Sequence, residues 1–139
     1  MASTLVTTRH TSGMQFISTL YGKHEVIIDD DVASGGHDSG TRPKALMLSS
    51  LAGCTGLDVV SLLQKMRVKF SDFSIDVEAH QTTEHPKMYN HVIITYKIKL
   101  APSSQAKMKK AVDLSQEKYC GVSAMFRAFC KLDYEIEFL

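Results

Sequence analysis

The chain opens with three short runs that are rich in β-branched and apolar residues, at 5–11, 14–20 and 24–29. Such runs are typical of half-buried β-strands. A Ser-Gly pair separates the first two runs, which predicts a hairpin. The next stretch, 30–41, is rich in glycine and aspartate and is expected to form a loop.

A long helix is predicted to follow this loop. Pro43 suits its first turn, where the missing N–H would have had no partner. Because a helix that is apolar nearly all round is buried, we expect this one to be the central core helix. Its polar residues, such as Ser49 and Asp58, argue against a membrane span. The apolar positions that cover most of its circumference are Leu46, Met47, Leu48, Leu51, Ala52, Leu57, Val59, Val60, Leu62, Leu63 and Met66.

The rest of the chain alternates between strands and helices. Strands are predicted at 73–82, 90–100 and 131–138, with helices at 103–119 and 122–128 before the last strand. The order βββ-α-ββ-αα-β indicates an α+β fold, in which an antiparallel sheet packs on the long helix. Since the 139 residues contain no repeat and no linker, we expect a single domain spanning 1–139.

Composition narrows the range of partners. A net charge of +1 gives no footprint for nucleic acid or for an anionic membrane. The N-terminus lacks the apolar core of a signal peptide, and no apolar run reaches the about 18 residues of a membrane span. We therefore expect a cytoplasmic protein, whose three cysteines are free thiols or partners in a transient redox reaction.

Cys54 lies in the middle of the long helix beside Gly53 and Gly56. Each glycine weakens a helix by about 1 kcal/mol relative to alanine. One interpretation is that the glycines leave room for a substrate to approach the sulfur. The other is that Cys54 is a small core residue and that the glycines allow tight packing against the second helix.

Cys120 falls where the second helix is predicted to end and a short helix to begin. A sulfur at the start of a helix faces free N–H groups, a setting that favours thiolate, although a plain helix joint would look the same in sequence. Cys54 and Cys120 therefore suggest a redox pair, in which a sulfenic acid at one is resolved by the other. Cys130, next to the last strand, is expected to be structural.

The six histidines do not form a metal-binding pattern. None are spaced at i, i+4 and none neighbour a cysteine. His80 and His91 could meet across the hairpin formed by the strands at 73–82 and 90–100, but no third ligand accompanies them. The sequence therefore predicts neither a metal site nor a cofactor.

Two segments together resemble the OsmC/Ohr family, and within it the short OsmC-like proteins. They are RPKALMLSSLAGCTGLDVVSLLQKMR, with Cys54 eleven residues after Pro43, and AVDLSQEKYCGVSAMF, with Cys120 followed by Gly-Val-Ser. The resemblance covers roughly residues 40–130. It implies an intertwined homodimer with two sites at the dimer interface.

The resemblance also implies a thiol-dependent reduction of hydroperoxides, chiefly organic ones, with a dithiol as reductant. Cys54 would then be the peroxidatic cysteine and Cys120 the resolving one. Family members use an arginine from the N-terminal strands to stabilise the thiolate, and Arg9 is the candidate. Lys44 and Ala45 stand where the family carries the glutamate that holds this arginine.

Further expectations concern the surroundings of the thiols. Met47, Leu51 and Phe126 are predicted to accept the alkyl chain of a substrate, while Asp58, one turn after Cys54, is expected to be structural and paired. Two alternatives remain: a protein on the same scaffold that binds a small ligand or senses oxidants, and a purely structural dimer. In the last case Cys54→Ser would change stability alone.

Overall fold

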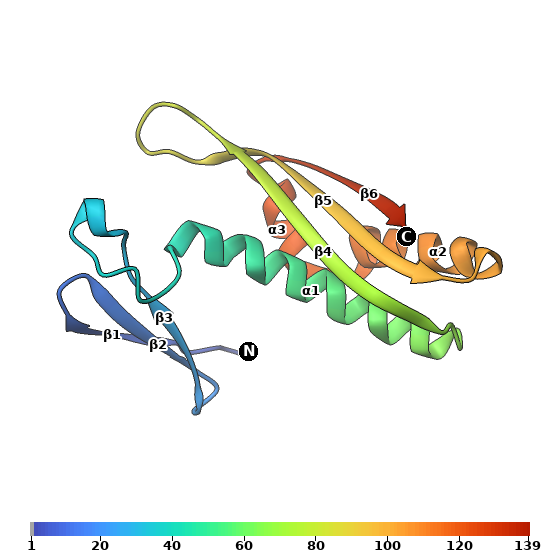
Figure 1. Ribbon diagram of the computed structural model, residues 1–139, viewed down its shortest axis with the longest axis horizontal. Helices are drawn as coiled ribbons and strands as arrows, with labels where there is room; N and C mark the ends of the chain where they lie inside the picture. Colours follow the sequence, from blue (N-terminus) through green and yellow to red (C-terminus); the bar gives the residue numbers. More distant parts are fainter. Residues whose placement is uncertain (1) are drawn as a thin grey trace. The chain divides into compact units, whose positions relative to one another are not determined.

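The computed structural model describes residues 2–139, which form two compact units, one ending at Met47 and the other comprising Leu48–Leu139. The predicted element order βββ-α-ββ-αα-β is confirmed, with short additional helical turns between some of the elements (Figure 1). The fold is α+β, as expected.

The first unit contains a three-stranded antiparallel sheet. It is built from β1 (Thr7–Ser12), β2 (Gln15–Leu20) and β3 (His24–Ile28), in the order β1-β2-β3. Every buried hydrophobic residue in the described part of the chain, Leu51 being the first along the sequence, belongs to the second unit. Three strands are stable on their own only with a hydrophobic face or a packed neighbour, and no hydrophobic residue of this sheet is buried in the single chain.

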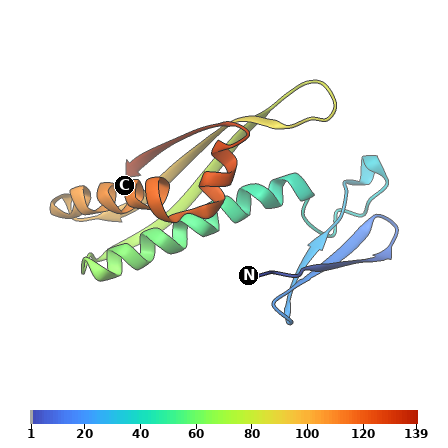
Figure 2. The ribbon, with the colours of Figure 1, turned by 180° about the vertical axis from the view of Figure 1, so that it is seen from behind.

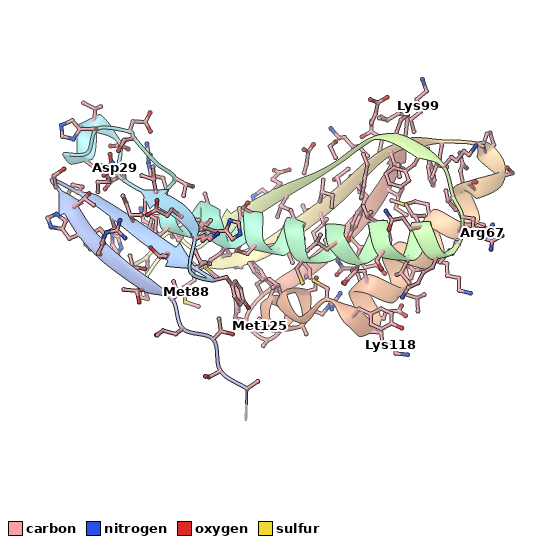
Figure 3. All side chains as sticks on the ribbon, turned by 90° about the horizontal axis from the view of Figure 1, so that it is seen from below. Asp29, Arg67, Met88, Lys99, Lys118 and Met125 are labelled. Atoms are coloured by element: carbon pink, nitrogen blue, oxygen red, sulfur yellow. The ribbon has the colours of Figure 1, made fainter. Side chains whose placement is uncertain are left out.

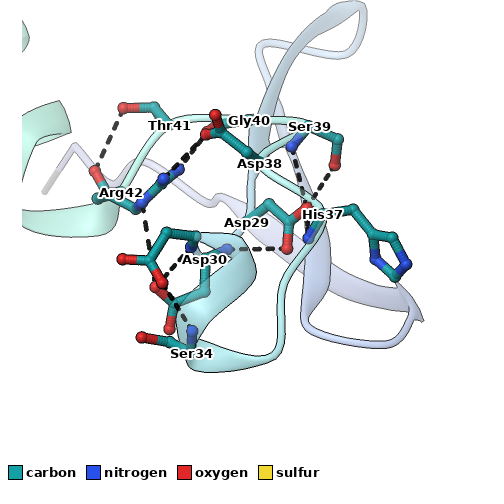
Figure 4. A network of polar contacts seen from close by, with 10 residues as sticks. Asp29, Asp30, Ser34, His37, Asp38, Ser39, Gly40, Thr41 and Arg42 are labelled. Atoms are coloured by element: carbon teal, nitrogen blue, oxygen red, sulfur yellow. Dashed lines mark hydrogen bonds and ion pairs between the residues drawn. The ribbon is translucent and has the colours of Figure 1, made fainter.

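The loop after β3 is organised around the carboxylate of Asp29, a residue that is 3% exposed (Figure 4). It accepts hydrogen bonds from the hydroxyl of Ser39 at 2.6 Å and from the backbone N–H groups of Asp30, His37 and Ser39. These donors, the Ser39 hydroxyl first, hold the pKa of Asp29 well below its usual range. The loop also includes the short helix η1 (Val32–Ser34).

Replacing Asp29 is expected to loosen this loop. In Asp29→Asn, amide hydrogen exchange at His37 and Ser39 should accelerate about tenfold, because an amide oxygen cannot accept all four bonds. A depressed carboxyl pKa stabilises the fold above its unfolded value of about 3.9, and this stabilisation is lost as the pH falls through the lower folded value. The difference between variant and wild type should therefore disappear in acid. Equal exchange at neutral pH in Asp29→Asn and in a surface control, Asp76→Asn, would contradict this role.

The long helix α1 (Pro43–Lys65) buries one face rather than its whole circumference. Leu51, Thr55, Val59 and Leu63 recur every fourth residue and are fully buried, whereas Leu57 is 77% exposed. The expectation of a helix buried nearly all round is thus wrong for the single chain. By length and composition alone α1 could cross a membrane, although the core helix of a soluble protein passes the same test.

A left-handed residue ends α1. Arg67, with a φ of 57°, lies at the corner where the chain turns back into β4 (Phe70–Gln81) (Figure 3). The N–H of Val68 donates to the carbonyl of Leu63 at 2.9 Å. This is the 6→1 hydrogen bond of a Schellman C-cap.

The second sheet has the order β4-β5-β6 and is mixed rather than purely antiparallel. β5 (Tyr89–Leu100) is antiparallel to β4 but parallel to β6 (Lys131–Phe138). Between β5 and β6 the chain passes through the helices α2 (Gln105–Leu114) and α3 (Gly121–Arg127). Parallel pairing of β5 with β6 requires such a crossover. The prediction of a purely antiparallel sheet is therefore wrong for this strand pair.

The core lies between one face of this sheet and the helices of the second unit. Alternate residues of β5, Val92 to Ile98, are buried together with residues of α1, α2 and α3. Figure 2 shows the helices on one side of the strands. The opposite face carries polar pairs, such as Lys97 with Asp76 at 2.8 Å. This sidedness is typical of a sheet that is covered on one face.

Candidate functional site

Cys54 and Cys120, separated by 66 positions, come together in the second unit. Their sulfur atoms and a carboxylate oxygen of Asp58 all lie within 4.8 Å of one another. Cys54 and Asp58 project from successive turns of α1, and Cys120 is the N-cap of α3. All three cysteines of the chain are free thiols, and Cys120 is the buried one, at 4% exposure.

A widened helical turn sets the position of Cys120. After α2 the chain forms a π-helical turn, η3 (Ser115–Tyr119), closed by the N–H of Cys120, which donates to the carbonyl of Ser115 at 2.7 Å. The sulfur of Cys120 then accepts a hydrogen bond from the N–H of Ser123 at 3.3 Å. The predicted placement of Cys120 at a helix start is therefore confirmed. Single π-helical turns occur frequently at functional sites.

The second unit by itself does not favour a thiolate at Cys54. Burial raises the pKa of this thiol, as do Cys120 and the charge of Asp58, while a hydrogen bond from the backbone of Val122 acts in the opposite direction. No basic side chain among residues 48–139 contributes to the pKa shift of Cys54. A cation that stabilises the thiolate therefore has to come from elsewhere.

A line of hydrogen bonds runs through the core to Asp58. The hydroxyl of Ser115 donates to the Asp58 carboxylate at 2.9 Å and is bonded to the hydroxyl of Thr55 at 2.7 Å. Thr55 is bonded to Tyr96 at 2.6 Å, and the side-chain amide of Gln116 donates to the Tyr96 hydroxyl at 2.7 Å. Each hydroxyl has one proton, and Ser115 donates its own to Asp58. Thr55 must therefore donate to Ser115, and Tyr96 to Thr55, so that every donor in the line points toward the carboxylate.

Arg127 anchors the far end of this line. Its guanidinium donates to the backbone and side-chain carbonyls of Gln116, both at 2.7 Å. Sequence reasoning missed this network. The signal available in the sequence was the polar residues near each cysteine, with Thr55 next to Cys54 and with Ser115 and Gln116 shortly before Cys120. The structure shows all three to be fully or almost fully buried.

Two surface depressions border the site. A pocket of about 180 Å³ is lined by Asp58, Ser61, Leu62, Lys65 and Tyr119. A wide, open groove of about 640 Å³ runs along the exposed face of α1 beside β4, lined by Ser49, Ala52, Gly53, Gly56, Leu57, Val60, Phe73, Ser74 and Ile75.

Both glycines beside Cys54 line this groove. A Cβ on Gly53 would meet nothing within 4 Å, whereas one on Gly56 would lie 3.1 Å from the Cδ1 atom of Ile75. Gly56 therefore permits close packing of α1 against β4 rather than against the second helix. Gly53 faces open space in the single chain.

The predicted substrate-contacting residues have different surroundings. Leu51 and Phe126 are core residues, 0% and 2% exposed, and Met47 on α1 is 42% exposed. Cys130 is a partly buried neighbour of the core, and burial raises its thiol pKa. Contacts of Met47, Leu51 and Phe126 with a substrate remain predictions.

Arg9 belongs to the first unit, on β1. Its guanidinium lies 3.2 Å from the carboxylate of Glu25 on β3 and also donates to Thr19. Glu25 therefore supplies this arginine with a carboxylate partner that sequence reasoning did not identify. The approach of Arg9 to Cys54 remains a prediction.

His80 and His91 face each other across the β4–β5 hairpin, as predicted, with ring centroids 5.9 Å apart. His91 also bonds to Asp133 at 2.8 Å. Within residues 2–139, the one group of three or more metal-binding side chains whose ligand atoms converge is Cys54, Asp58 and Cys120.

Comparison with known proteins places this arrangement in context. Residues 36–135 match the family model described as OsmC-like protein. The chain is 29% identical to Protein YhfA of Escherichia coli (strain K12) over 125 residues, or 90% of each chain.

Solved structures show the same fold. A hypothetical protein from Aquifex aeolicus VF5 superposes with a TM-score of 0.80 and 28% identity, covering 100% of this chain and 99% of the other. The organic hydroperoxide resistance protein OhrB of Bacillus subtilis shares the fold at 17% identity, with a TM-score of 0.64 and 98% coverage of both chains. The family match over most of the sequence shows that this chain belongs to the OsmC-like protein family.

Proposed function

We propose that the protein is a thiol-dependent peroxidase that reduces hydroperoxides, chiefly organic ones. The observation that carries this proposal is the convergence of the Cys54 and Cys120 sulfurs within 4.8 Å. The names of two fold relatives, the organic hydroperoxide resistance proteins of Bacillus subtilis and Legionella pneumophila, support the substrate class.

The proposed peroxidase reaction has three steps. The Cys54 thiolate attacks the O–O bond of the hydroperoxide, forms a sulfenic acid and releases an alkoxide, which leaves as the alcohol after protonation. The Cys120 thiol then condenses with the sulfenic acid, which forms the Cys54–Cys120 disulfide and releases water. A cytoplasmic dithiol reduces this disulfide by thiol–disulfide exchange and is itself oxidised.

Arg9 is the proposed source of the cation that the thiolate requires, with Glu25 holding its guanidinium. A positive charge near a thiol lowers its pKa. In Arg9→Ala the alkylation of Cys54 by iodoacetamide at pH 7 should therefore be several-fold slower, and its pH profile should move upward. Cys130 in the same sample is the internal control. Superimposable Cys54 profiles for variant and wild type would remove Arg9 from the mechanism.

The protein is further proposed to act as a homodimer. Two features support this: no hydrophobic residue among 2–47 is buried, and Leu57 is exposed in the open groove along α1. An exposed apolar patch of this kind is typical of an interface.

A charge in the lining of the groove should separate the subunits. Leu57→Asp is expected to weaken the dimer by about 100-fold or more, because the carboxylate would be buried without a partner. Sedimentation velocity measures the change, with Val32→Asp, at another exposed apolar residue, as control. A wild-type protein that sediments as a monomer at micromolar concentration would refute the dimer.

Steady-state turnover tests the enzymatic proposal. The protein should consume cumene hydroperoxide in the presence of excess dithiothreitol. Cys120→Ser should perform one rapid turnover and accumulate a sulfenic acid that dimedone traps at Cys54. Absence of both turnover and dimedone adduct would overturn the proposal.

A second candidate function is a ligand-binding or oxidant-sensing protein on the same scaffold. The observation that favours it is the raised pKa of Cys54, since a protonated thiol reacts slowly with peroxide. The binding function predicts slow oxidation that a dithiol does not turn into catalysis. The turnover assay therefore separates the two functions.

A further inference from the structure

Three potential metal ligands of different chemistry meet at one point. The sulfurs of Cys54 and Cys120 and a carboxylate oxygen of Asp58 are mutually within 4.8 Å, and they are contributed by two separate elements, α1 and the start of α3. Thiolate ligands select borderline and soft ions, and a Cys₂Asp set suits Zn²⁺ in particular. We propose that Cys54, Asp58 and Cys120 form a zinc-binding site in the fully reduced protein.

The spacing requires only a small adjustment. Zn–S bonds of about 2.3 Å and Zn–O bonds of about 2.0 Å in a tetrahedron put ligand atoms roughly 3.5–3.8 Å apart. The three atoms are at most 4.8 Å apart without an ion. Binding would therefore require the three side chains to move toward a common centre.

A hydrogen bond from a neighbouring side chain orients the Asp58 carboxylate. Ser115 donates to one oxygen of Asp58, Oδ2, at the end of a line of bonds whose members all point toward it. Outer groups of this kind orient metal ligands and raise the affinity for the ion. Asp58 forms no ion pair within residues 2–139, so the Zn²⁺ has no competing ion pair to displace from this carboxylate.

Charge and access are also suitable. Binding exchanges the two thiol protons for one Zn²⁺, so that two thiolates and one carboxylate surround a divalent cation. The three ligands leave the fourth position for water. Asp58 also lines the pocket of about 180 Å³, so the site borders an open depression on its carboxylate side.

The inference does not depend on peroxide turnover, although it uses the same two thiols. Bound zinc would occupy both sulfurs and protect them from alkylation. A Cys54–Cys120 disulfide would abolish binding. The site therefore predicts a metal that the reduced protein holds and the oxidised protein lacks.

Cobalt substitution tests the site directly. The reduced full-length protein, titrated with Co²⁺ without oxygen, should bind one equivalent per chain with a sulfur-to-cobalt charge-transfer band and the intense visible bands of a tetrahedral site. Cys54→Ser and Cys120→Ser should each lose at least half of the charge-transfer intensity, while Cys130→Ser should keep all of it. Asp58→Asn should weaken binding by about tenfold or more, and Ser115→Ala by less.

A second measurement guards against misfolded variants. In the wild-type protein, one equivalent of Zn²⁺ should bleach the cobalt spectrum and should protect Cys54 and Cys120, but not Cys130, from alkylation as mapped by peptide mass. The absence of a charge-transfer band in the reduced wild type would overturn the proposal. So would a band that follows Cys130, or equal alkylation of all three cysteines in zinc.

Discussion

Cys54→Ser should reduce the rate of hydroperoxide consumption by at least about 10³-fold, because the reaction loses the only sulfur that can attack the O–O bond and be resolved by Cys120. The substitution replaces sulfur by oxygen at a half-buried position of α1 and should leave the fold intact. Stopped-flow measurement of cumene hydroperoxide loss, with circular dichroism on the same samples, gives both values.

The matched control is Cys130→Ser. Cys130 is also a partly buried thiol whose pKa is raised by burial, but it belongs to the edge of the core and not to the cysteine pair. This variant should keep the wild-type rate. If Cys54→Ser retained full activity, or if Cys130→Ser lost it, the assignment of the chemistry to Cys54 would be wrong.

Leu51→Ala should destabilise the protein by about 3 kcal/mol. Leu51 is fully buried within the core of the second unit, so the truncation removes apolar contacts and leaves a cavity. Urea denaturation followed by circular dichroism measures the change in the free energy of unfolding.

Leu5→Ala is the control with the same chemical change. Leu5 is 84% exposed, so its truncation should alter the stability by less than about 0.5 kcal/mol. If Leu51→Ala were as stable as the wild type but had a raised KM for an alkyl hydroperoxide, Leu51 would be a wall of the substrate site and not a core residue.

The arrangement of the elements follows closely from periodicity. The alternation in 90–100 and the four-residue recurrence of Leu51, Thr55, Val59 and Leu63 both record burial against a neighbouring layer. The direction of β6 was not predictable in this way, because apolar alternation is the same in parallel and antiparallel strands. The helical crossover before β6 was the available signal.

The candidate site was predictable only in part. Two cysteines at unusual helical positions were visible in the sequence, but their approach depends on the π-helical turn at Ser115–Tyr119, which no residue type signals by itself. The line from Gln116 to Asp58 also depends on that turn. The many apolar residues of α1 predicted burial nearly all round the helix. In the single chain, one face of α1 is instead exposed.

The most direct test of the central claim is a peroxide titration of the reduced protein, followed by counting of free thiols and mapping of disulfide-linked peptides. One equivalent of cumene hydroperoxide should remove two of the three thiols per chain and link the peptide of Cys54 to that of Cys120, with Cys130 still free. Three thiols untouched after the same treatment, or a disulfide that includes Cys130, would contradict the assignment of Cys54 and Cys120 as the reactive pair.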